Sequence, residues 1–131
     1  MICHHCASIV VAFTLDHRPH PKGRPRFGRG RTYTDDKTRA YEARVEKACR
    51  AAMKGRAPHA GPVELVALFE QRNAMGADVD NLLKAVSDAI EGVAFANDRQ
   101  VCRIGAARVL KADVDRVSVA VLAAHPTTKE T

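Results

Sequence analysis

The sequence predicts a single small domain of the α/β (α+β) class, in which helices cover a β-sheet. Its 131 residues allow one hydrophobic core but not two. Hydrophobic residues make up 46% of the chain, which is ordinary for a globular protein and excludes wholesale disorder. Periodic segments follow in the order strand, helix, strand, helix, strand, strand, with no repeat and no linker. We therefore expect one domain over residues 1–131, with flexible termini at 1–7 and 124–131.

The N-terminal half predicts a strand, a long loop and a helix. Residues 9–15 alternate in side-chain type and are apolar enough for a central strand. Residues 17–34 are too rich in proline, glycine and arginine for regular structure and predict a long ordered loop. A helix capped by Asp35 or Asp36 then extends to about Met53. Its apolar face consists of Tyr41, Val45, Ala48, Cys49 and Ala52.

The C-terminal half predicts a strand, a second helix and two further strands. The next strand is marked by Val63, Leu65, Ala67 and Phe69, with Glu64 and Glu70 on its opposite side. The second helix covers about 81–91, and Gly92 is placed to end it. The last two strands are expected at 100–109 and 117–121. The second helix should bury Leu82 or Leu83, Val86, Ala89 and Ile90.

The chain is basic, with a net charge of +6, and this favours a polyanionic partner. The segment from His17 to Arg31, both included, contains six Arg or Lys residues and no acid. A solvated basic loop would explain the charge alone. It explains less well why prolines and glycines are interleaved there, since these hold the backbone extended beside a surface. We therefore expect this loop to contact nucleic acid.

Several other protein classes are excluded. No apolar run approaches the roughly 20 residues needed to span a bilayer. Residues 7–15 are not a signal-peptide core, because residues 16–19 do not form a small-residue cleavage site. We therefore expect a cytoplasmic protein without a structural disulfide. Although Cys3 to Cys6 suggest zinc, the two intervening histidines could hardly complete the same tetrahedron. Cys49 and Cys102 fit core positions.

Asp78 and Asp80 are the first candidates for chemistry. If their backbone is extended, both carboxylates project to one side and repel each other. A hard divalent cation such as Mg²⁺ or Mn²⁺ would offset that repulsion. The simpler interpretation makes Asp80 a helix N-cap and Asp78 a solvated loop acid.

Lys84 and Asp98 strengthen the case for a catalytic site. Lys84 follows Asp80 by one helical turn, so it could pair with an aspartate or stabilise charge on a phosphate. The helix N-terminus adds N–H groups that favour a phosphate oxygen. Asp98 follows a short turn at the start of the next strand, where it could be a third carboxylate or only a turn residue. Asn81 and Asp88 read as helix-surface residues, although Asn81 could orient an aspartate.

With these residues assembled, the sequence resembles the RusA-type Holliday junction resolvases, small endodeoxyribonucleases of bacteria and their phages. The resemblance covers nearly the whole chain. Its most specific part is the segment 78–85, Asp-Val-Asp-Asn-Leu-Leu-Lys-Ala, which continues through Asp88 and residues 92–101. Residues 21–27 with 32–34 look like the family's basic loop, and Gly61-Pro62-Val63 opens the strand before the site.

The resemblance implies a site, a fold and a substrate. The family's three metal-site aspartates match Asp78, Asp80 and Asp98, and its required lysine matches Lys84. The implied fold is a mixed sheet with helices on one face. The implied assembly is a homodimer that uses Mg²⁺ or Mn²⁺, which suits the two-fold symmetry of a four-way DNA junction. The DNA backbone would be held by Lys22, Arg24, Arg26 and Arg29.

The chain also departs from the family. Asn97 stands where members commonly show a second acid, and Gly76-Ala77 replace a basic residue or proline. Cys3 to Cys6 have no family counterpart. None of these changes removes a ligand or the lysine, so we expect an active junction-resolving endonuclease. The alternatives are a nuclease that prefers flaps or forks, and a branched-DNA-binding protein without catalysis.

Overall fold

The computed structural model describes residues 8–22, 26–28, 31–33, 35–73 and 78–124. The expected flexible termini lie outside these ranges except for Ala124, whose N–H donates to the carbonyl of Pro62 at 2.9 Å. The segment from Cys3 to Cys6 also lies outside them.

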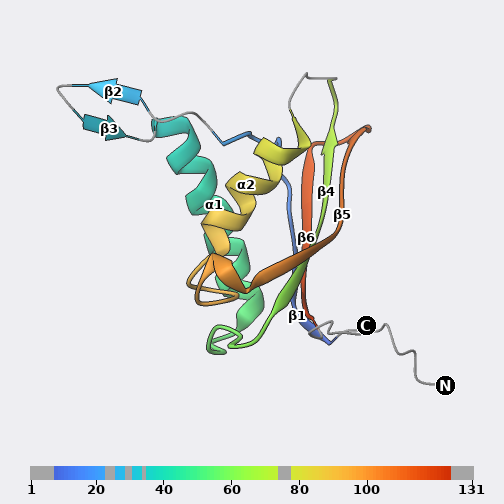
Figure 1. The fold of residues 1–131 in the computed structure, drawn as a ribbon. Coiled ribbons are helices and arrows are strands. Elements are labelled where there is room, and N and C mark those ends of the chain that lie inside the picture. The colour runs from blue at the N-terminus through green and yellow to red at the C-terminus, as the bar shows by residue number, and fades with distance from the viewer. Residues whose placement is uncertain (1–7, 23–25, 29–30, 34, 74–77, 125–131) are drawn as a thin grey trace.

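Four strands form one mixed sheet in the order β1-β6-β4-β5 (Figure 1). Strand β6 pairs antiparallel with β1 and β4, whereas β4 and β5 pair in parallel. A parallel pair needs a crossover, and the second helix supplies it. Strand β5 therefore occupies one edge of the sheet and β1 occupies the other, so the expectation of a central strand at residues 9–15 was wrong. The strands are β1 (Ile9–Leu15), β4 (Val63–Gln71), β5 (Val101–Lys111) and β6 (Arg116–Ala123).

Both helices, α1 (Asp36–Met53) and α2 (Val79–Ile90), lie on one face of this sheet (Figure 1). The cap of α1 is Asp35, whose carboxylate accepts from the N–H of Thr38 at 2.7 Å. Alternate residues of β4 are buried, so its apolar side packs under the helices. The predicted α/β class and both predicted helices are thus confirmed. Core side chains include Tyr41, Val45, Cys49, Leu65, Phe69, Leu82, Val86 and Ile90.

Two further predictions from the sequence were wrong at this level. The segment 17–34 is not wholly irregular, because β2 (Arg26–Gly28) and β3 (Arg31–Tyr33) form a two-stranded hairpin. Strands of three residues are too short to show a period of two in the sequence. Cys102 is exposed rather than in the core. Cys102 lies at a register shift between β4 and β5. Strand β5 is an edge strand, so it has a neighbouring strand, β4, on one side only.

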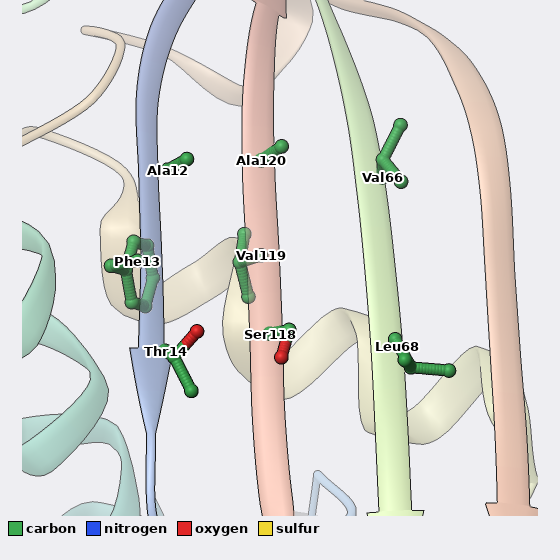
Figure 2. A pocket seen from close by; sticks show the side chains of 8 residues that line it. All are labelled: Ala12, Phe13, Thr14, Val66, Leu68, Ser118, Val119 and Ala120. Atoms are coloured by element: carbon green, nitrogen blue, oxygen red, sulfur yellow. The ribbon is translucent and has the colours of Figure 1, made fainter.

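The open face of the sheet carries a hollow of about 370 Å³ (Figure 2). Its lining comes from β1, β4 and β6 and contains no acid, base or thiol. The only side-chain hydroxyls are those of Thr14 and Ser118. This surface therefore lacks groups for acid–base or metal chemistry. No helix within the described ranges is long and apolar enough to cross a membrane.

Candidate active site

A hollow of about 290 Å³ lies between α2 and β5, and we call it the α2–β5 hollow. One side is lined by Asp80, Lys84 and Asp88, which follow one another at successive turns of α2. Ser87 lies on the same side, and Asp98 also lines the hollow. The structure thus brings three of the four predicted catalytic residues, Asp80, Lys84 and Asp98, to one concave surface.

Asp78 does not line this hollow. Helix α2 begins at Val79, so Asp78 is its N-cap, without a side-chain capping bond, and Asp80 lies in the first turn. The helix thus starts at Val79 rather than near the expected Asn81, and the simpler interpretation of Asp80 as the N-cap was wrong. Helical residues two apart differ by about 200° around the axis, whereas extended ones would share a side. Asp78 itself has an extended backbone (φ −72°, ψ 135°) and Asp80 is helical, so the two do not belong to one extended segment as the sequence argument assumed.

Asp98 is held by its neighbours in a short 3-10 turn, η1 (Asp98–Gln100). Its backbone N–H donates to Oε2 of Glu91 at 3.1 Å. Asn97 caps the turn, because its side chain accepts from the N–H of Arg99 at 2.8 Å. The residue that departs from the family pattern thus has a structural role. Asp98 precedes β5 rather than beginning it.

Gln100 is a residue that our sequence reasoning missed. Its Oε1 accepts from the N–H groups of Ala96, at 2.8 Å, and Asn97, at 2.9 Å. Its Nε2 donates to the carbonyls of His59, at 2.6 Å, and Gly61, at 2.8 Å. Gln100 therefore ties the turn that carries Asp98 to the loop before β4. The spacing from Asn97 to Gln100 matches a capping box, which was the available signal.

Lys84 belongs to a chain of charges along α2. Its Nζ lies 3.7 Å from Oδ1 of Asp88, and its side chain is 62% exposed. The other oxygen of Asp88 lies 3.1 Å from Nζ of Lys22, which also meets Glu42 at 2.7 Å. Burial tends to lower the pKa of Lys22, but these hydrogen bonds outweigh it and the pKa is raised. Lys84 is thus weakly held and accessible, whereas Lys22 is firmly paired within the protein.

The predicted DNA-binding set is only partly visible. The ammonium group of Lys22 already pairs with two carboxylates of the protein, whereas a phosphate contact needs an ammonium group that is free to bind. Arg24 and Arg29 lie outside the described residues, and Arg26 opens β2. Contact between these arginines and DNA stays a prediction.

The carboxylates suit a hydrated hard cation rather than a closed metal cage. Asp80 and Asp98 are exposed, and neither carboxylate has an ion pair or hydrogen bond with a described residue. No three His, Cys, Asp or Glu side chains in the described ranges form a group that could hold a metal. Mg²⁺ commonly uses one or two carboxylates and takes its other ligands from water and substrate phosphate. The donor set therefore fits Mg²⁺ or Mn²⁺ in that manner.

Comparison with known proteins identifies the family. A family model for the endodeoxyribonuclease RusA matches residues 16–122. No curated protein gives a significant match. The matched range includes both helices and every residue that lines the α2–β5 hollow. RusA nucleases are generally metal-dependent, in keeping with the acidic side chains there. The chain therefore belongs to the RusA endodeoxyribonuclease family.

Proposed function

We propose that this protein resolves four-way DNA junctions by paired symmetric nicks, using Mg²⁺ or Mn²⁺. The observation that carries the proposal is the α2–β5 hollow of a RusA-family chain, which combines Asp80 and Asp98 with an accessible Lys84. Two exposed carboxylates can hold a divalent cation, and an ammonium group in the same hollow can stabilise charge on a phosphodiester under attack. We expect it to act in the cytoplasm on bacterial or phage DNA.

Each residue has a distinct part in this proposal. Asp80 and Asp98 would hold the cation, with Asp78 at the N-cap of α2 as the third carboxylate ligand. A cation held there would make a water nucleophilic at neutral pH and would offset phosphate charge. Lys84 is exposed enough to leave Asp88 and stabilise charge on the attacked phosphate. N–H groups at the start of α2 would bind a phosphate oxygen.

DNA contact and assembly complete the proposal. Arg24, Arg26 and Arg29 would hold the DNA backbone and add salt dependence rather than sequence preference. We assign Lys22 to anchoring the start of this segment, because Glu42 and Asp88 already bind its ammonium group. A homodimer would place two sites across the two-fold axis of a junction. Light scattering coupled to size exclusion would measure that assembly.

Cleavage of a synthetic four-way junction, mapped to the nucleotide, tests the proposal. With Mg²⁺ the full chain should nick two strands symmetrically. Asp80→Asn should lower the rate at least about 100-fold while junction binding persists. Asp113→Asn, an exposed aspartate on the β5–β6 turn without an ion pair in the described chain, is the matched control. Full activity of Asp80→Asn would refute the mechanism. Faster cleavage of flaps than of four-way junctions would refute the proposed substrate. Junction binding without cleavage in Mg²⁺ or Mn²⁺ would refute the proposed catalysis.

A further inference from the structure

The α2–β5 hollow has an apolar side that takes no part in the proposed cleavage of the phosphodiester. Leu65 and Leu83 form a nearly buried floor, and Val101 and Ile104 form a wall on β5. Ile104 stands out because its side chain is 54% exposed although it lies beside charged groups. A scattered exposed isoleucine is ordinary, but this one continues a buried apolar surface into the proposed catalytic hollow.

The pairing of β4 and β5 explains why Ile104 faces the hollow. Ile104 pairs with Leu65, a buried residue of β4, so both side chains lie on the helix side of the sheet. Strand β5 is an edge strand, and no further strand covers it. The register shifts directly after this pair, at Gly105, where an added Cβ would collide with the carboxylate of Glu64. The pairing with Leu65 therefore directs the Ile104 side chain towards the hollow, just before the strand register changes.

We propose that Ile104 and the floor beneath it bind the face of an unstacked nucleobase next to the phosphate that is cut. This inference rests on the proposed function and specifies which part of the DNA the hollow recognises. Base faces are the large apolar surfaces of a nucleic acid, but inside a duplex they are covered by neighbouring bases. They become accessible at branch points and in single strands. An apolar wall beside the catalytic groups thus favours branched DNA over plain duplex.

The charges around the hollow favour DNA over a second copy of the chain as the occupant. Asp80, Lys84 and Asp98 are exposed at the hollow. A protein partner seated on Ile104 would bury these charges, and the cores of protein interfaces are depleted of charged residues. A nucleotide leaves them in contact with phosphate, cation and water.

The test compares Ile104→Ala with the wild type in junction binding. Binding is measured with Ca²⁺ in place of Mg²⁺, because Ca²⁺ also takes carboxylate ligands but accepts a looser coordination geometry than Mg²⁺. We expect Ile104→Ala to weaken binding of a four-way junction about fivefold and leave duplex binding unchanged. Ile104→Leu should restore most of the difference. Ile9→Ala is the matched control, since Ile9 is 63% exposed and begins the strand at the other edge of the sheet.

Fluorescence gives a readout independent of affinity and of cleavage. A junction with 2-aminopurine beside the mapped cut site should brighten on binding wild type, because unstacking relieves quenching, and brighten less with Ile104→Ala. The inference would be overturned if Ile104→Ala lost junction and duplex binding equally, or if the fluorescence of the junction were the same with Ile104→Ala as with wild type. Cleavage of the junction by the wild type would still support the proposed function in that case. Dissociation of a dimer by Ile104→Ala would instead identify a protein interface and also overturn it. Failure of the wild type to bind branched DNA would refute both proposals.

Discussion

Replacing Gln100 should disturb catalysis without touching any proposed catalytic residue. The side chain makes four hydrogen bonds with backbone groups, two on the turn before Asp98 and two on the loop before β4. Gln100→Ala removes all four. Gln100→Glu keeps the two accepted bonds but cannot donate to the carbonyls of His59 and Gly61 while it is ionised.

The expected magnitude follows from that count. A hydrogen bond contributes about 0.5–1.5 kcal/mol net, and the backbone groups on the exposed turn regain water as partners. Gln100→Ala should therefore lower the free energy of unfolding by about 2–3 kcal/mol, and Gln100→Glu by about 1–2 kcal/mol. Displacement of Asp98 by about 1 Å would lower kcat about 100-fold, with junction affinity nearly unchanged.

Urea unfolding and single-turnover junction cleavage measure the two effects. Asn73→Ala removes an exposed amide with no hydrogen bond in the described chain and is the control. In Gln100→Glu, acid pH should restore part of the stability, because a protonated carboxyl can donate one of the missing bonds. Stability within about 0.5 kcal/mol of wild type, together with unchanged kcat in Gln100→Ala, would refute the assigned role.

Three further predictions concern stability and reactivity. Asp88→Asn breaks ion pairs with two lysines and should cost about 1 kcal/mol in urea unfolding, since both pairs are partly exposed. Gly105→Ala should change the free energy of unfolding by less than about 1 kcal/mol, because the added Cβ displaces the flexible carboxylate end of Glu64, and a double-mutant cycle with Glu64→Ala should measure that coupling. Burial raises the pKa of Cys49 to about 11 from 9.0, so its contribution to stability is complete below pH 9 and is lost as the pH rises towards 11. Cys49→Ala should reduce the loss of stability at alkaline pH. Iodoacetamide at pH 8, followed by peptide mapping, should label Cys102 but not Cys49. Equal labelling of both cysteines would contradict the burial of Cys49.

Helix and strand positions were largely predictable because periodicity is a local property. The spacing of apolar residues placed α1 correctly to within its capping residue, and strand alternation placed β1 at Ile9–Leu15. The start of α2 was less accessible. Asp78 and Asp80 are both good caps by residue type, and the choice between them depends on where the preceding loop delivers the chain.

By itself, the sequence determined the α/β class, the family and the identity of Asp80, Lys84 and Asp98 as candidates. These depend on residue types at fixed spacings, which are read without knowing any contact. The tertiary structure decided that these three residues line one hollow, whereas Asp78 does not line it. It also decided that Lys22 forms ion pairs within the protein and that an exposed Ile104 lines the same hollow as the charged residues. Such features depend on strand register, edge position and the packing of α2 on β5. These arise from partners distant in sequence, so no local pattern encodes them.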